Sequence, residues 1–134
     1  MTPAIGSIGW IDLTVPDAEG VRRFYEQVVG WKPQPIDMEG YADYCMLPPG
    51  SDQPAAGVCH ARGPNADLPP HWLVYITVAD VAQSVAACKA NGGTVLREPR
   101  EMGGALIAVI KDPAGAVCAL FQPPGGEKAE GPKG

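Results

Sequence analysis

The stretch WIDLTVPDAEGVRRFYEQVVG, from Trp10 to Gly30, decides the fold, because the chain repeats its pattern once. At an offset of 63 residues, TVPD at 14–17 aligns with TVAD at 77–80, and Gly30 aligns with Gly93. An internal repeat constrains the architecture more firmly than any single motif. We therefore expect two similar modules within one domain of 134 residues, and a site on the surface that they share.

Alternation of side chains along residues 8–15 predicts a strand with one apolar face and one mixed face. The apolar face, which we expect to meet a helix, carries Ile11, Leu13 and Val15. The mixed face, where we expect the site, carries Trp10, Asp12 and Thr14. In the second copy Leu73, Tyr75 and Thr77 take the corresponding positions.

Each of these strands is followed by the pattern of a capped helix. Asp17 and Asp80 are suited to accept hydrogen bonds from the first free amides. Gly30 ends the first helical pattern, and Asn91-Gly92-Gly93 ends the second. The predicted buried stripe of the first helix consists of Val21, Phe24, Tyr25 and Val28. The predicted stripe of the second helix consists of Val81, Val85 and Cys88.

Further strands are expected at 31–36, 41–47, 55–61, 72–78, 94–97, 105–111 and 116–121. The organisation is then a first βαβββ module at 1–62, a linker at 63–71, a second βαβββ module at 72–124 and a flexible tail at 125–134. The fold class is α+β. We expect a curved mixed sheet around a central cup, with both helices outside.

Composition excludes several classes of function. The formal net charge is −5 and the ten basic residues form no stripe, so we expect no nucleic-acid partner. No apolar run approaches the ~20 residues of a membrane span, so we expect no membrane partner. The first residues lack a basic region followed by an apolar core, and the four cysteines form no CxxC pair, which together indicate a reducing cytoplasm.

The order of several short motifs resembles the vicinal oxygen chelate superfamily, which includes glyoxalase I, bleomycin-resistance proteins and extradiol dioxygenases. The motifs are IDLTVPD…FYEQVVGW, GY at 40–41, AAGV at 55–58, WLVYITVAD, NGGTVL and DPAGAVCALFQ. The resemblance covers about residues 5 to 123 and is strongest to short glyoxalase-like proteins. It implies the paired βαβββ fold and a homodimer.

The resemblance also implies a divalent metal held by His, Gln or Glu on the inner strand faces. The positions of three usual ligands fall here on Trp10, Leu73 and Ala119, which offer no suitable donor. The fourth position falls within residues 56–60, where His60 is the one candidate ligand. A catalytic metal needs about three protein ligands. We therefore expect no metal cofactor, with a divalent metal as the alternative.

Each candidate site residue also has a purely structural interpretation. Trp10 is predicted to form an aromatic wall for a planar ligand, or else to be a core tryptophan. Asp12 and Tyr75 share the repeat offset, so they would orient a polar group, or else join the modules by a hydrogen bond. His60 would contact the ligand, whereas His60 and His71 would otherwise be ordinary loop or surface histidines. The predicted rim of the cup consists of Tyr41, Tyr44, Met46 and Met102, for which core packing is the alternative. Trp72 is one residue out of the inward register, which favours packing.

The sequence thus predicts a cytoplasmic, metal-independent and non-catalytic binder of a small, planar, apolar molecule such as an antibiotic or metabolite. Two alternatives stay open. One is a metal-dependent lyase, isomerase or dioxygenase of the same superfamily, and the other is a non-catalytic interaction module.

Overall fold

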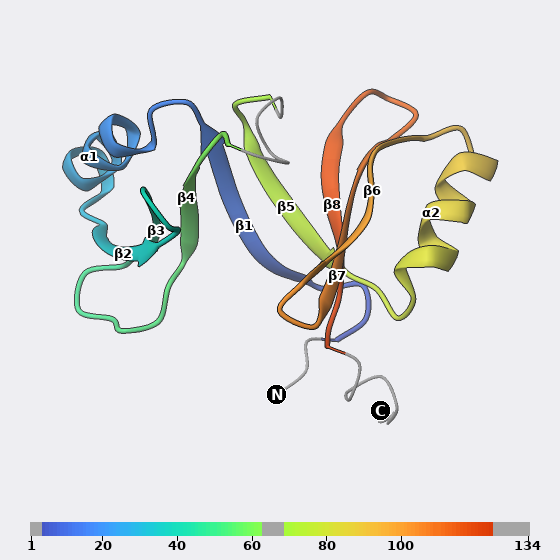
Figure 1. The fold of residues 1–134 in the computed structure, drawn as a ribbon, viewed down its shortest axis with the longest axis horizontal. Helices are drawn as coiled ribbons and strands as arrows, with labels where there is room; N and C mark the ends of the chain where they lie inside the picture. The colour runs from blue at the N-terminus through green and yellow to red at the C-terminus, as the bar shows by residue number, and fades with distance from the viewer. Residues whose placement is uncertain (1–3, 63–68, 125–134) are drawn as a thin grey trace. The chain divides into compact units, whose positions relative to one another are not determined.

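The computed structural model describes residues 4–62 and 69–124, whose elements are drawn in Figure 1. The chain divides into two compact units: residues Trp10–Trp72 form the first, and the described parts of 4–9 and 73–124 form the second. The predicted tail and residues 63–68 of the predicted linker lie outside the described residues. The elements are β1 (Ile8–Val15), α1 (Ala18–Val29), β2 (Lys32–Asp37), β3 (Ala42–Leu47), β4 (Ala56–His60), β5 (Trp72–Thr77), α2 (Val81–Ala90), β6 (Thr94–Met102), β7 (Ala105–Lys111) and β8 (Val117–Gln122).

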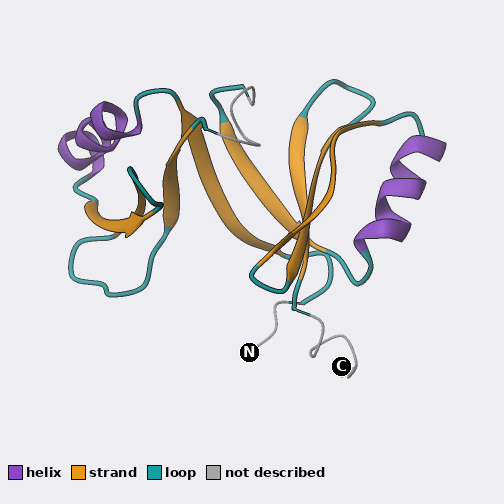
Figure 2. Cartoon of the chain, viewed as in Figure 1, coloured by secondary structure: helices purple, strands orange, loops and turns teal. Residues whose placement is uncertain are grey.

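Both units have the same connectivity, which Figure 2 shows by type of element. The strand order is β2-β3-β4-β1 in the first and β6-β7-β8-β5 in the second. In each unit the opening strand pairs in parallel with the last one, β1 with β4 and β5 with β8. The remaining pairs are antiparallel. The predicted α+β class and the duplicated βαβββ module are therefore confirmed.

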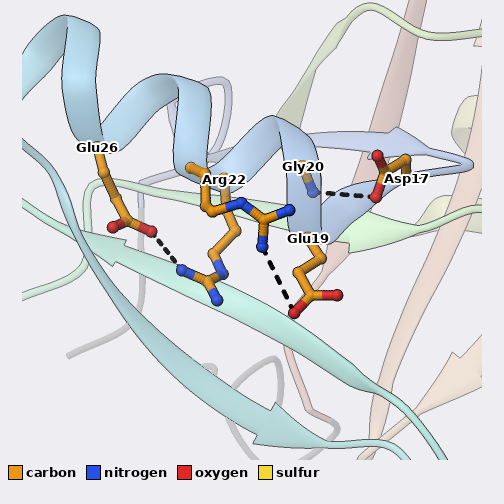
Figure 3. Close-up of polar contacts among 6 residues, drawn as sticks. Asp17, Glu19, Gly20, Arg22 and Glu26 are labelled. Carbon is orange, nitrogen blue, oxygen red and sulfur yellow. Dashed lines mark hydrogen bonds and ion pairs between the residues drawn. The ribbon is translucent and has the colours of Figure 1, made fainter.

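Figure 3 shows how local polar contacts hold α1. Asp17 Oδ1 accepts a hydrogen bond from the Gly20 N–H at 3.0 Å, and Gly30, with φ at 78°, ends the helix. Arg22 pairs with Glu26, and Arg23 lies 3.6 Å from Glu19. The repeat holds at α2, where Asp80 Oδ1 accepts from the Gln83 N–H at 3.2 Å. Both predicted caps are confirmed.

The predicted buried stripe of α1 is wrong in two of its four positions. Val21 and Tyr25 pack on the core, but Phe24 is 56% exposed and Val28 is 59% exposed. The buried face is instead centred on Ala18 and includes Arg22, whose guanidinium lies 4.9 Å from the ring centroid of Tyr44. The long aliphatic stem of arginine allows it to cover apolar surface, so polarity alone misplaced the stripe.

The two outer strands of the described sheets also depart from simple patterns. β6 continues to Met102, beyond the predicted end at Arg97, because register shifts between Val95 and Arg100 accommodate Pro99. β2 contains Pro33 and Pro35 yet pairs continuously with β3. Proline has no N–H for a ladder, so these two residues direct their donor-free edge away from β3.

Each unit has its own apolar core on the helix side of its sheet. In the first unit the core residues are Leu13, Val15, Ala18, Tyr44, Met46 and Val58. In the second they are Val81, Val85, Ala108 and Leu120. Among the described residues, no helix has the length and apolarity needed to cross a bilayer.

Candidate functional site

Strand pairing in the first unit sorts the predicted site residues onto two faces. Asp12 pairs with Gly57 and Thr14 with Cys59, and Gly57 in turn pairs with Cys45. These positions share the sheet face opposite α1, because Leu13, Val15 and Val58 occupy the alternate positions beneath the helix. The predicted mixed face of the first strand is therefore confirmed as the face away from its helix.

The indole of Trp10 lies close to Gly57 on this face. A Cβ built on Gly57 would be 3.2 Å from Trp10 Cζ2 and 3.1 Å from Asp12 Cβ. The missing side chain at position 57 thus makes room for the indole beside the Asp12 side chain. Trp10 remains half-buried, while Asp12 is buried.

Cys59 follows Gly57 on the same face and has a weakly acidic thiol. Burial raises its pKa above the usual range, and the negative charges of Asp12 and Asp43 raise it further. The thiolate is the nucleophilic and metal-binding form of cysteine. This environment therefore disfavours both roles for Cys59.

The residues present do not fit the metal that the superfamily's usual chemistry employs. Leu73 and Ala119 are buried apolar side chains, and Trp10 places an indole over Gly57. On the face of β4 opposite α1, Gly57 has no side chain, and burial raises the pKa of the Cys59 thiol. Within 4–62 and 69–124, no three His, Cys, Asp or Glu side chains gather as a metal site would require.

A pocket of about 310 Å³ opens on the other face of the first unit, the face covered by α1. It is lined by Ile11, Trp31, Ala55, Ala56 and Trp72. The two indoles meet edge to face, with centroids 6.0 Å apart. We call this the aromatic pocket.

Tyr25 on α1 contacts both tryptophans of the aromatic pocket. Its ring centroid lies 5.7 Å from that of Trp31 and 5.4 Å from that of Trp72. Its hydroxyl accepts a hydrogen bond from Trp72 Nε1 at 3.3 Å. Because the indole N–H of Trp72 already has a partner, this wall presents apolar ring surface to the pocket.

The other predicted site residues are distributed among different surroundings. Tyr44 and Met46 are buried in the core beneath α1, since they alternate with Cys45 on β3. His60 follows Cys59 on β4 and therefore takes the opposite face of the sheet, the face of Val15. Its ring centroid lies 5.4 Å from that of Tyr41, with the two rings edge to face. Tyr75 and Met102 lie in the second unit, where Met102 is 45% exposed.

The sequence pattern did not predict the aromatic pocket as a site. The predicted packing of Trp72 is confirmed, because it packs on the core of the first unit, and it lines the pocket as well, as does the helix-facing Ile11. Trp31 directly follows Gly30, which ends α1. This position could have indicated that the indole packs against the helix, as its contact with Tyr25 shows. Nothing local in the sequence indicated that Trp31 and Trp72 meet, since they are far apart along the chain.

The comparisons with known proteins identify relatives over most of the chain. The family model described as Glyoxalase/Bleomycin resistance protein/Dioxygenase superfamily matches residues 7–120. The anthracycline biosynthesis protein DauV of Streptomyces sp. (strain C5) is 31% identical over 113 residues, which are 84% of this chain and 40% of DauV. The putative glyoxylase CFP32 of Mycobacterium tuberculosis (strain CDC 1551 / Oshkosh) is 30% identical over 109 residues, which are 81% of this chain and 41% of CFP32. The chain thus spans about two fifths of the length of these relatives.

Two solved structures share the fold at low sequence identity. Methylmalonyl-CoA epimerase from Mycobacterium tuberculosis is 18% identical with a TM-score of 0.53, over 96% of this chain and 97% of the epimerase. The hypothetical protein BH1468 from Bacillus halodurans C-125 is 16% identical with a TM-score of 0.59, over 87% of this chain and 94% of BH1468. Because the family model covers most of the chain and two copies of the βαβββ module are present, the protein belongs to the glyoxalase/bleomycin resistance protein/dioxygenase superfamily.

Proposed function

We propose that this protein binds a small, planar, largely apolar molecule without the help of a metal. The observation that carries the proposal is the aromatic pocket, where two indoles meet beside small aliphatic side chains. Ligand pockets are commonly ~300–1,000 Å³ and lined by apolar and aromatic groups. A pocket of about 310 Å³ suits a molecule of two or three fused rings.

The chemistry of the pocket wall favours an apolar ligand over a charged one. None of its five lining residues has an ionisable side chain. A charge buried there would lose hydration without gaining a partner, which is costly. A flat ring instead gains contact with the indole faces, which is worth about 0.5–1.5 kcal/mol per aromatic pair beyond its area burial.

The relatives support a ligand of this kind. DauV is named for anthracycline biosynthesis, and anthracyclines contain a flat fused-ring system. We therefore propose a fused-ring antibiotic or a metabolite from the making of such a compound.

The face opposite α1 is the competing location for the same ligand. There we propose Trp10 and Asp12 as the ligand contacts of the first unit. In this arrangement Tyr44 and Met46 belong to the core on the other face of the sheet. The two locations predict different effects of tryptophan substitutions.

Calorimetric titration with a dihydroxyanthraquinone tests the proposal. We expect Trp72→Phe and Trp31→Phe each to weaken binding by about 3- to 10-fold, because a phenyl ring covers less of the ligand. Trp10→Phe is the matched control and should leave the affinity unchanged. Thermal unfolding of each variant checks that the fold is intact.

Two results would contradict this location or this function. Loss of affinity in Trp10→Phe alone would place the ligand on the face opposite α1. Absence of binding by the wild-type protein to any fused-ring probe would refute the function itself.

Native mass spectrometry of protein purified without chelator tests the remaining parts of the proposal. We expect a homodimer of the 14.0 kDa chain that carries no divalent ion. One tightly held ion per chain would instead favour the lyase, isomerase or dioxygenase alternative.

A further inference from the structure

A polar cluster lies near the end of β4 in the first unit, formed by Tyr41, Asp43, His60 and Arg62. The Asp43 carboxylate accepts a hydrogen bond from the His60 backbone N–H at 2.8 Å and lies 3.6 Å from His60 Nδ1. The guanidinium of Arg62 lies 4.3 Å from the ring centroid of Tyr41. We propose that His60 and Arg62 together bind an anionic group, a carboxylate or a phosphate, at a site separate from the aromatic pocket.

The orientation of His60 leaves one ring nitrogen available for a ligand. Nδ1 is buried and faces the carboxylate of Asp43, and the side chain as a whole is 17% exposed. Nδ1 has no hydrogen-bond partner among the described residues. When both ring nitrogens carry a proton, one N–H is directed toward Asp43 and the other can donate to an anion.

Arg62 supplies a positive charge. Its guanidinium lies over the Tyr41 ring, a contact that does not use its N–H donors. Within the part of the chain that the structure describes, no carboxylate forms an ion pair with Arg62. Its donors therefore remain available for a planar carboxylate or a phosphate.

Tyr41 contacts both side chains. Its ring centroid lies 5.4 Å from that of His60, with the two rings edge to face, and the Arg62 guanidinium lies over its face. Their pairing on one ring gives the protein a local anion-binding point.

The cluster is distant from the aromatic pocket. The pocket includes Ala56, the first residue of β4, and the cluster includes His60, the last. Four residues of strand separate them by about 13 Å. One small ligand therefore does not occupy both, and the two sites are tested independently.

Imidazole NMR of the full chain tests the anion site. The chain has two histidines, so His71 serves as an internal reference. Protein with 15N-labelled histidine is titrated with inorganic phosphate and, separately, with sodium benzoate, while sodium chloride holds the ionic strength constant. We expect saturable shifts of the His60 ring signals and none for His71. The tighter of the two anions identifies the ligand as a phosphate or a carboxylate.

Substitutions then separate an anion site from a structural cluster. Arg62→Gln should weaken anion binding about tenfold, which is the size of one charge-assisted hydrogen bond. Arg23→Gln is the matched control, since it removes an exposed arginine on α1, and it should change nothing. Trp72→Phe should also leave anion binding unchanged, so failure of the ligand pocket would not affect this result. The proposal is overturned if neither anion gives a saturable shift, or if Arg62→Gln binds as tightly as wild type.

Discussion

At the residue scale, Gly57 shows how the absence of a side chain shapes a surface. Neither turn geometry nor helix termination requires glycine here, because the residue lies within a paired strand. Its value lies in the space that Trp10 and the Asp12 side chain fill instead. The glycine is therefore part of the candidate surface opposite α1.

Gly57→Ala should lower the free energy of unfolding by about 1–3 kcal/mol, the usual cost of overpacking. The new Cβ would lie 3.2 Å from Trp10 Cζ2, so the indole must move. Urea denaturation measures the loss. In a Trp10→Ala background the same substitution should cost less, because the indole is gone. An equal cost in both backgrounds would show that the new Cβ is opposed by Asp12 alone and not by Trp10.

What the sequence reveals about single residues depends on how local the cause is. The faces of Asp12, Thr14 and Leu13 follow from strand alternation, so they were predictable. The contact of Tyr25 with Trp72 spans 47 positions, and no local pattern encodes it. The proximity of Asp43 to His60 likewise arises only when β3 folds back beside β4.

At the element scale, α1 shows that an apolar stripe does not define the buried face of a helix by itself. Within the predicted stripe, Tyr25 packs on the core, whereas Phe24 is exposed. The face that packs is decided by how the helix lies on its sheet. Capping is more local, and both aspartate caps were predictable from the repeat.

Substitutions of Phe24 and Tyr25 test which face of α1 is buried. Phe24→Ala should change the free energy of unfolding by less than about 1 kcal/mol, because the ring is largely in water. Tyr25→Ala should cost about 3 kcal/mol, since it removes a ring that packs on the core and on two indoles. Chemical denaturation of the two variants measures the difference, and equal losses would indicate the predicted stripe rather than the observed face.

The two caps provide a second prediction at this scale. Asp17→Ala and Asp80→Ala should each destabilise the protein by about 1 kcal/mol, because each leaves a helix amide without its acceptor. Asp17→Asn and Asp80→Asn keep an acceptor and serve as controls. Thermal unfolding compares the four variants. A loss as large in the asparagine variants would point to charge rather than to the hydrogen bond.

At the scale of the whole molecule, the internal repeat made the architecture predictable. The offset aligned two strands and two aspartate caps, and both units have the same strand order, although α2 ends two residues earlier than the offset from α1 implies. The functional site was less predictable, because ligand pockets depend on side chains from several elements. The aromatic pocket needs residues from β1, the loop after α1, the residues around the start of β4, and β5.

Stability at alkaline pH depends on thiols in both units. Burial raises the pKa of Cys59 most, and it also raises those of Cys45 and Cys118. Above pH ~8.5 an unfolded thiol ionises while the buried one stays protonated, so the native state binds more protons. The free energy of unfolding should therefore fall as pH rises, with Cys59 contributing up to about 1.4 kcal/mol per pH unit.

Urea denaturation between pH 8 and 10 under reducing conditions measures this dependence. Cys59→Ala should show a flatter decline than the wild type. Cys88→Ala is the matched control, because it leaves the three thiols with raised pKa in place. Parallel declines for wild type and Cys59→Ala would show that this thiol ionises in the native state.

The prolines of β2 have a consequence for behaviour in concentrated solution. An unpaired strand edge recruits other chains when it offers alternating donors and acceptors, and this is a route to fibrils. Along Pro33 and Pro35 the outer edge of β2 offers carbonyl oxygens without matching N–H groups. A second chain docking there would leave its own acceptors unsatisfied. We therefore expect replacement of both prolines by threonine to shorten the lag time of thioflavin-positive aggregation, while replacement of one leaves most of the protection.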